Sequence, residues 1–240
     1  MLRILACLPL GMLIYRYRLL DLKGTLAATA IAITIVLAAG FSWLGLLLLF
    51  LILGHISTKY KYSYKAALEV AEGDHGRRSI SNVLANGLVA TLVSLPWYLN
   101  TRGYFPVDLA VPIAAAYIAV IATVTGDTLS SEIGILSNHE PVLITSFQRV
   151  PPGTQGGISL LGEAVGLLGA LTIGLAAWLL GMAGLKVALL SAVVGGAVGF
   201  NFDSLLGAVF ERRRMLGNAG VNFLSTIAGG LVGFRLALAL

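Results

Sequence analysis

The chain has 240 residues, of which 58% are hydrophobic and only 11% are charged, and its mean hydropathy is +0.91. Soluble domains carry about 25% charged residues, so an ordinary soluble globule is excluded. A disordered chain is excluded because the apolar content is too high. The single cysteine excludes an internal disulfide. The three histidines are isolated from one another, so no histidine or cysteine spacing suggests a zinc site. The apolar runs are continuous rather than alternating, which indicates an all-α, polytopic transmembrane helix bundle rather than a membrane β-barrel.

Eight apolar stretches follow one another along the chain, and each is a candidate membrane helix. They are Ile4–Tyr15, Gly24–Gly40, Phe41–Ile56, Val83–Leu99, Leu109–Gly126, Ile158–Leu180, Leu185–Phe210 and Val221–Leu240. Residues 24–56 are barely long enough for two membrane helices and too long for one. We predict two short helices there, with a break at Ala38–Ser42. Residues 1–240 are expected to form a single integral membrane domain of about seven or eight helices.

Basic residues predict the orientation of these helices. If residues 16–23 and 59–81 lie on one side, then residues 127–157 and 211–220 lie there too. Basic residues on that side are Arg16, Arg18, Lys23, Lys59, Lys61, Lys65, Arg77, Arg78, Arg149, Arg212, Arg213 and Arg214, whereas the other side has Arg3, Arg102, Lys186 and Arg235. This bias predicts that the first side is cytoplasmic and that the protein lies in the cell membrane.

Charge also limits the partners and the place of any chemistry. The net charge of +5 follows from the positive-inside bias, so we expect no nucleic-acid partner. The alternating basic and tyrosine residues of Lys59–Lys65 indicate an interfacial belt on anionic headgroups. Of the eleven acidic residues, only Asp108 falls on the outer side. We therefore expect short cytoplasmic loops to form the site.

The first of five polar blocks runs from Glu72 to Asn86, before and into a predicted helix. Paired arginines suit bidentate phosphate binding, and a helix start offers free N–H groups. The alternative is a solvated loop with positive-inside arginines, followed by amide contacts between helices. The candidate binding residues are Glu72, Asp74, Arg77, Arg78, Asn82 and Asn86.

Two further blocks place acids inside helices. Asp127 ends an apolar run and is followed by Ser131 and Glu132, and Asp203 lies nearly two turns inside the basic end of its helix. An acid in a membrane helix is a functional hypothesis by default, and carboxylates are usual Mg²⁺ ligands. We predict Asp127 and Asp203 as metal ligands. The alternatives are a helix boundary at the headgroups for Asp127 and a structural ion pair for Asp203.

The remaining blocks are a proline- and glycine-rich loop, Arg149–Glu163, and the start of the last helix, Asn222–Thr226. Glycines allow N–H groups to converge on an anion, although no Gly-Lys-Ser/Thr of a Walker A loop follows. The glycines at positions 162, 166 and 169 are expected to let a neighbouring helix approach closely. Candidate binding residues are Arg149, Gly153, Thr154, Gly156, Gly157, Ser159, Asn222 and Ser225.

Together the five blocks resemble the integral-membrane family that contains plant phytyl-phosphate kinase and an uncharacterised animal transmembrane protein, over roughly residues 20–240. Gly126-Asp127-Thr128 is also similar to the Gly-Asp-Thr/Ala element of dolichol kinase and of CDP-diacylglycerol synthases, in which an acidic pair and a basic glycine loop serve CTP and Mg²⁺. The loop departs from that pattern. Phosphatidate cytidylyltransferases carry Ser-Pro-Lys-Lys-Thr-x-Glu-Gly, and this chain has no lysine after Arg149 in the loop.

The resemblance implies a CTP- and Mg²⁺-dependent kinase that converts a prenyl monophosphate, such as a phytyl or geranylgeranyl phosphate, to its diphosphate at the cytoplasmic face. Asp127 and Asp203 would hold Mg²⁺ with Glu132 assisting, and Arg77, Arg78 and Arg149 would clamp phosphates. The expected partners are the lipid bilayer, a prenyl-phosphate lipid and a nucleoside triphosphate, and the sequence is compatible with a homo-oligomer. A membrane cytidylyltransferase and a small-molecule transporter are the alternative functions.

Overall fold

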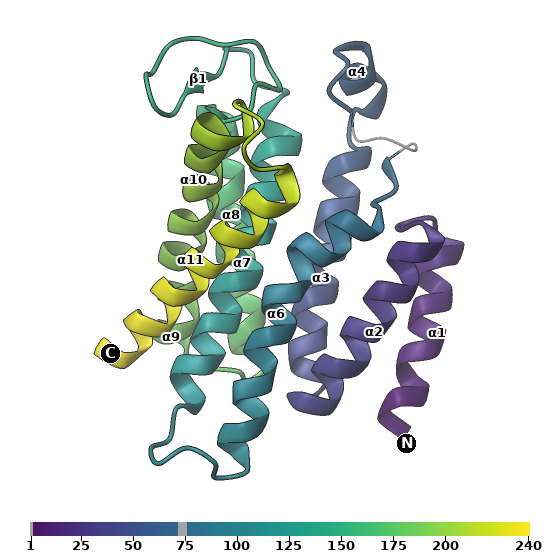
Figure 1. The fold of residues 1–240 in the computed structure, drawn as a ribbon, viewed down its shortest axis with the longest axis vertical. Coiled ribbons are helices and arrows are strands. Elements are labelled where there is room, and N and C mark those ends of the chain that lie inside the picture. The colour runs from purple at the N-terminus through teal and green to yellow at the C-terminus, as the bar shows by residue number, and fades with distance from the viewer. Residues whose placement is uncertain (1, 72–75) are drawn as a thin grey trace.

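The computed structural model describes residues 2–71 and 76–240. Within this part the chain is a helix bundle with a small hairpin at one end (Figure 1). Its elements are α1 (Leu2–Arg16), α2 (Leu22–Ala38), α3 (Phe41–Lys59), α4 (Tyr62–Ala67), α6 (Ile80–Thr101), α7 (Ala110–Gly134), β1 (Val142–Leu143), β2 (Gly157–Ile158), α8 (Leu160–Leu179), α9 (Leu185–Leu190), the π-helical turn η1 (Ser191–Gly195), α10 (Gly196–Leu206), the π-helical turn η2 (Gly207–Glu211) and α11 (Asn218–Ala239). The run from α9 to η2 is one continuous helix of 27 residues.

The predicted fold class is confirmed, and each of the eight apolar stretches contains a helix. Among the described residues, six helices are long and apolar enough to cross a membrane, and α2 is a shorter apolar helix. The break between α2 and α3 falls where it was predicted. Gly40 has a φ of 95°, which a residue with a side chain rarely adopts, so the helix stops there and restarts at Phe41.

Helix α7 is the centre of the bundle. The protein buries 83% of its most apolar stretch, against 33–39% for the other five spans. It packs against α3, α6, α8, α10 and α11. This is feasible because much of the helix is alanine, including Ala114, Ala115, Ala119 and Ala122, so neighbouring backbones approach closely.

Glycines on the neighbouring helices complete this close packing, as predicted for α8. A methyl group added at Gly162 would lie 3.4 Å from the Cα of Gly134, and one added at Gly166 would lie 3.2 Å from the Gly126 carbonyl oxygen. On the other side of α7, a methyl group at Gly195 would lie 2.7 Å from the Ala119 Cβ. Dispersion contacts between close backbones thus hold the helices together where lipid removes the hydrophobic driving force.

The basic loops gather at one end of the bundle, where α4 and the hairpin lie (Figure 1). Leu20, just after α1, pairs with Arg78 in a short parallel bridge, and the Asp21 N–H donates to the Arg78 carbonyl oxygen at 3.2 Å. The start of α1 and the loop between α6 and α7 lie at the opposite end. The helices therefore alternate in direction as the charge pattern requires, and the cytoplasmic assignment of the basic end stays a prediction.

Replacing Gly195 with alanine tests the packing on α7. The new methyl group would overlap Ala119 and the backbone of α11, which we expect to destabilise the protein by about 1–3 kcal/mol. Thermal unfolding in detergent, followed by tryptophan fluorescence, measures this loss. The control is Gly184→Ala, where no atom lies within 4 Å of the added methyl and the change should stay within about 0.5 kcal/mol. Equal stability of the two variants would contradict the packing account.

Candidate functional site

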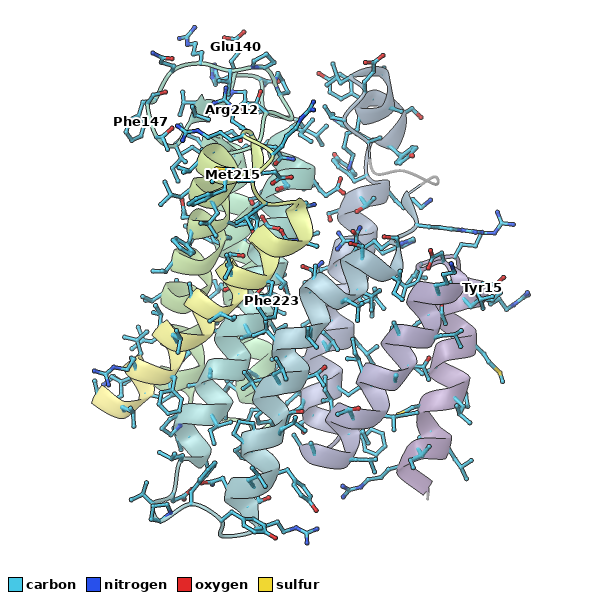
Figure 2. The ribbon with its side chains drawn as sticks, viewed as in Figure 1. Tyr15, Glu140, Phe147, Arg212, Met215 and Phe223 are labelled. Atoms are coloured by element: carbon cyan, nitrogen blue, oxygen red, sulfur yellow. The ribbon has the colours of Figure 1, made fainter. Side chains whose placement is uncertain are left out.

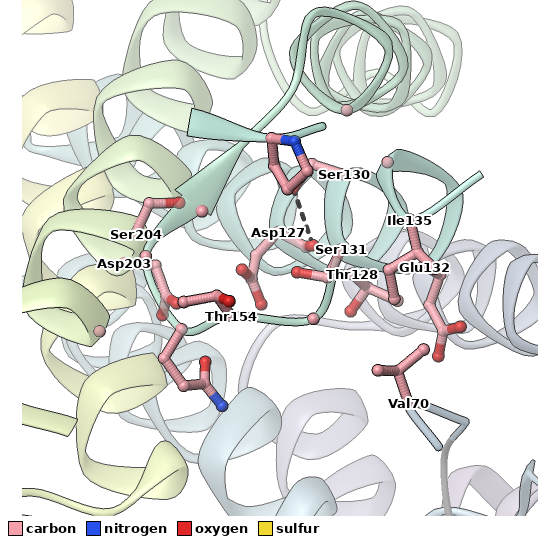
Figure 3. Close-up of a pocket in the computed structure, with 18 of the residues that line it drawn as sticks. Val70, Asp127, Thr128, Ser130, Ser131, Glu132, Ile135, Thr154, Asp203 and Ser204 are labelled. Atoms are coloured by element: carbon pink, nitrogen blue, oxygen red, sulfur yellow. Dashed lines mark hydrogen bonds between the residues drawn. The ribbon is translucent and has the colours of Figure 1, made fainter. Parts of the chain in front are cut away.

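A polar pocket of about 470 Å³ opens at the basic end of the bundle. Its walls come from α6, α7, α10 and the start of α11, and the loop of the hairpin covers one side (Figure 3). Residues Glu69–Ala71, after α4, form part of its rim. All five polar blocks, from distant parts of the sequence, thus contribute residues to one cavity.

Asp127 and Asp203 form the floor of this pocket. Their carboxyl groups lie within hydrogen-bonding reach of each other, and both side chains point into the same space (Figure 3). The Ser225 hydroxyl, buried behind them, donates to the Asp203 Oδ2 at 2.8 Å. Asp127 lies seven residues before the end of α7, a depth of about 10 Å. Two adjacent carboxylates at this depth repel each other unless a proton or a cation lies with them.

Arg78 brings positive charge to this wall. Its Nη1 lies 3.5 Å from the Thr128 Oγ1, and its charge is close enough to act on Asp127. The guanidinium also lies over the Phe50 ring, 5.7 Å from the ring centroid. Gly54 provides the space, because a side chain there would begin 3.3 Å from the Arg78 Nη2. A planar guanidinium held in this way suits binding of a phosphate group.

Amide side chains line the wall between α6 and α11. The Asn222 Nδ2 donates to the Asn86 Oδ1 at 3.2 Å. In the opposite amide orientation the same group would donate to the Asp203 Oδ2 at 3.1 Å and to Asn218. Asn82 lies one turn before Asn86 and also lines the pocket. Amide side chains in a membrane helix are costly unless they have polar partners. Here they contact one another and line the polar pocket.

The glycine-rich loop covers the pocket because its glycines fit where no side chain would. β1 and β2 pair antiparallel, with Val142 opposite Ile158, and the loop between them carries Gly156 at a φ of 77°. A methyl group on Gly156 would lie 2.4 Å from the Ala208 Cβ of η2. The loop backbone is thereby held against the helix that carries Asp203, and Thr154 lines the same pocket as the two aspartates (Figure 3). Backbone N–H groups in such a loop are suited to an anion.

Glu132 lies on the other side of the pocket, near Val70 and away from the aspartate pair (Figure 3). Lys65 donates to the Glu132 Oε2 at 2.6 Å and to the Ser57 carbonyl oxygen at 2.9 Å, and the Thr58 hydroxyl donates to the Glu132 Oε1 at 2.8 Å. The Lys65 side chain is fully buried. The ion pair therefore fastens α4 and the rim of the pocket to α7.

This ion pair corrects the interfacial interpretation of Lys59–Lys65. Tyr60 and Tyr64 are exposed, as a headgroup belt requires, but Lys65 is turned inward. The spacing of basic and aromatic residues gave no sign of this, because the partner, Glu132, lies on a distant helix.

Most of the predicted site residues meet in the pocket. The predicted residues that line it are Arg78, Asn82, Asn86, Asp127, Ser131, Glu132, Gly153, Thr154, Gly156, Gly157, Ser159, Asp203 and Asn222. Ser159 also caps α8, because its hydroxyl oxygen accepts from the Gly162 N–H at 3.1 Å. Ser225 lies behind Asp203. Glu72 and Asp74 lie outside the described residues.

Two predicted arginines lie elsewhere. Arg149 is exposed on the hairpin and Arg77 is half-buried, and neither lines the pocket. Glu140, Phe147 and Arg212 also lie at this end of the bundle (Figure 2). Conversely, Thr128, Ser204 and Asn218 line the pocket without having been predicted. Each of the three lies within four residues of a predicted site residue, and this proximity in the sequence could have been used to predict them.

The donor set limits the metals that the pocket could hold. Among the described residues there is no group of three or more histidine, cysteine or acidic side chains that could hold a metal. The Asp127–Asp203 pair is an all-oxygen site with two carboxylates. Mg²⁺ is commonly held by one or two carboxylates, with water and substrate phosphates completing its shell, so the pair fits Mg²⁺ better than zinc.

Comparisons with known proteins place these features in a wider group. The family described as "Integral membrane protein DUF92" matches residues 5–230. An uncharacterised membrane protein of Methanocaldococcus jannaschii is 39% identical over 96% of this chain and 91% of its own length. Protein PGR of Arabidopsis thaliana is 30% identical over 86% of this chain and 79% of its own, and the chloroplastic protein VTE6 of the same plant is 27% identical over 76% and 55%. No solved structure matches the chain.

Removing the buried lysine tests the role of the ion pair. Lys65→Met leaves Glu132 without its charged partner, which we expect to destabilise the protein by about 3–5 kcal/mol in thermal unfolding. Lys23→Met makes the same exchange at an exposed site and should have little effect. Adding Glu132→Gln to Lys65→Met should restore part of the stability, because the unpaired charge is then gone. A double variant no more stable than Lys65→Met would show that the pair is not coupled.

Proposed function

Because this chain belongs to the DUF92 family of integral membrane proteins, we propose that it is a lipid-phosphate kinase that transfers the γ-phosphoryl group of CTP to a prenyl monophosphate. The product is a prenyl diphosphate, and the reaction takes place in the pocket at the basic, cytoplasmic end of the bundle. Support comes from the resemblance of the polar blocks to the family that contains plant phytyl-phosphate kinase.

The observation that carries the proposal is the Asp127–Asp203 pair at the floor of a pocket that also holds Arg78 and a glycine-rich loop. Carboxylates bind a metal ion, an arginine binds phosphate oxygens, and loop N–H groups donate hydrogen bonds to an anion. These three kinds of group together are what a nucleoside triphosphate and a phosphate acceptor require. The pocket lies at one end of the helices, where a lipid phosphate would lie at headgroup depth.

Phosphoryl transfer to a lipid monophosphate requires the protein mainly to position the two substrates and to neutralise their charge. A phosphate monoester is largely dianionic at neutral pH, so its oxygen attacks without a general base. A bond forms between that oxygen and the γ-phosphorus, the bond from the γ-phosphorus to the β–γ bridging oxygen breaks, and CDP leaves with the electron pair. Arg78 would neutralise charge on the transferred group, and the loop around Thr154 would hold the triphosphate.

Asp127 and Asp203 would hold Mg²⁺ in this scheme, with Ser225 fixing the Asp203 carboxylate. When bound, the ion would neutralise phosphate charge and orient the nucleotide. Glu132 is held by Lys65 and Thr58 in the structure, so we assign it to the rim rather than to the metal.

The second candidate is cytidylyl transfer, which the Gly126-Asp127-Thr128 element supports because CDP-diacylglycerol synthases carry a similar one. There the lipid phosphate attacks the α-phosphorus and pyrophosphate leaves. The same pocket would serve both reactions, and the leaving group distinguishes them. A transporter is less well supported, because the polar residues collect at one end of the helices rather than at the midplane.

Asp127→Asn is expected to lower turnover by roughly a hundredfold or more, because it removes one of the two carboxylates without changing the size of the side chain. Purified protein in detergent with Mg²⁺, CTP and a prenyl monophosphate provides the assay. Glu140→Gln is the matched control, since it neutralises an exposed acid at the same end of the bundle and should leave turnover unchanged. Full activity of a folded Asp127→Asn variant would exclude the metal role.

Arg78→Gln is expected to lower kcat/KM by about tenfold to a hundredfold, because hydrogen bonds to charged groups contribute about 1.5–3 kcal/mol each. Arg78→Lys keeps the charge but loses the bidentate geometry, so it should recover only part of the loss. Arg212→Gln removes an exposed arginine at the same end and is the control. If Arg78→Gln and Arg212→Gln behave alike, Arg78 does not bind substrate phosphate.

A further inference from the structure

A second cavity lies beside the polar pocket, among α1, α2, α3 and α6. Its volume is about 70 Å³, and its walls are almost entirely apolar. Two of the polar groups in the wall are satisfied within their own helices. The Thr29 hydroxyl donates to the Thr25 carbonyl oxygen at 2.8 Å, and the Cys7 thiol donates to the Arg3 carbonyl oxygen at 3.4 Å. We name this cavity the apolar groove.

The apolar groove adjoins the polar pocket at two places. Asn86 lines both cavities, and its buried amide group bonds to Asn222 on the pocket side. Phe50 lines the groove, while the guanidinium that lies over its ring belongs to Arg78, which lines the pocket. A lipid phosphate could therefore place its phosphate at Arg78 in the polar pocket and its apolar chain past Phe50 in the apolar groove.

The size of the groove limits what fits. A volume of 70 Å³ holds about five groups of the size of a water molecule, which corresponds to roughly one isoprene unit. Gly87 lines the groove on α6, where a methyl group would lie 2.9 Å from the Ile31 Cδ1, so the groove is narrow at this point. One isoprene unit of a single chain would therefore fit, whereas two chains side by side would not.

We infer that the apolar groove binds the first isoprene unit of a single-chain lipid monophosphate whose phosphate lies at Arg78. This inference rests on the proposed function for its substrate class, and it adds where the chain lies and why a single-chain lipid is preferred to a diacyl one. Substrate would enter from the bilayer between α1, α2 and α3, with its head moving into the polar pocket beside Asn86.

The test uses farnesyl monophosphate that carries a diazirine in the isoprene unit next to the phosphate, added to the full-length protein in detergent. After irradiation, peptide mass spectrometry locates the label. We expect labelling in α2 and α3 at residues of the groove, such as Ala28, Leu47 and Leu51, with competition by unlabelled farnesyl monophosphate. Labelling that is spread over the lipid-facing surface, or that survives competition, would overturn the inference.

A variant that fills the groove provides the second arm. Ala28→Phe places an aromatic ring in the cavity, and we expect it to lower groove labelling about tenfold, or ~1.4 kcal/mol of binding. Ala30→Phe makes the same exchange on the exposed side of α2 and should leave labelling unchanged. Thermal unfolding of both variants in detergent checks that they are folded. If Ala28→Phe is unfolded, the position of the label in the unaltered protein decides the question.

Binding and turnover separate this inference from the proposed function. Groove labelling without phosphoryl transfer would support the groove and refute the kinase. Phosphoryl transfer with the label outside the groove, or with labelling unchanged in a folded Ala28→Phe variant, would refute the groove and leave the kinase standing.

Discussion

Two carboxylates placed side by side in a largely apolar bundle are the constraint on which the site depends. Asp127 and Asp203 come from helices far apart in the sequence, and their carboxyl groups nevertheless lie within hydrogen-bonding reach. Such a pair is unfavourable in a medium that solvates charge poorly, unless a proton, a cation or hydrogen-bond donors lie with it. Ser225 and Arg78 supply part of that compensation, and a bound metal ion would supply the rest.

The packing of the bundle is what allows the two acids to meet. Alanine along α7 and glycine on its neighbours bring the backbones of α7, α8, α10 and α11 close together. Bulky residues at these contacts would separate α7 from α10 and with them Asp127 from Asp203. At the same end, the Lys65–Glu132 pair fastens α4 to α7, and Gly156 lets the loop lie on η2. Each contact positions part of the pocket wall without itself reaching the aspartates.

Much of the fold follows from the sequence because a membrane leaves few alternatives. Continuous apolar runs must be helices, and Gly40 marks the break between the second and third of them. The polar blocks meet in one pocket because alternating helices return each block to the same end of the bundle. The sequence does not determine how far a loop residue reaches. Arg149 was predicted beside the phosphates and lies exposed on the hairpin, whereas Lys65 was predicted at the headgroups and is buried against Glu132. Both depend on contacts between segments that no local spacing encodes.

The fate of the CTP phosphates tests the central claim most directly. Purified protein would be given Mg²⁺, a prenyl monophosphate and CTP radiolabelled at either the γ- or the α-phosphate, with ATP compared in parallel. We predict that the γ-label appears in a prenyl diphosphate while the α-label remains in CDP. An α-label in the lipid, with release of pyrophosphate, would instead show cytidylyl transfer. Absence of either label from the lipid, across a panel of prenyl monophosphates, would contradict the assignment of this pocket to a kinase.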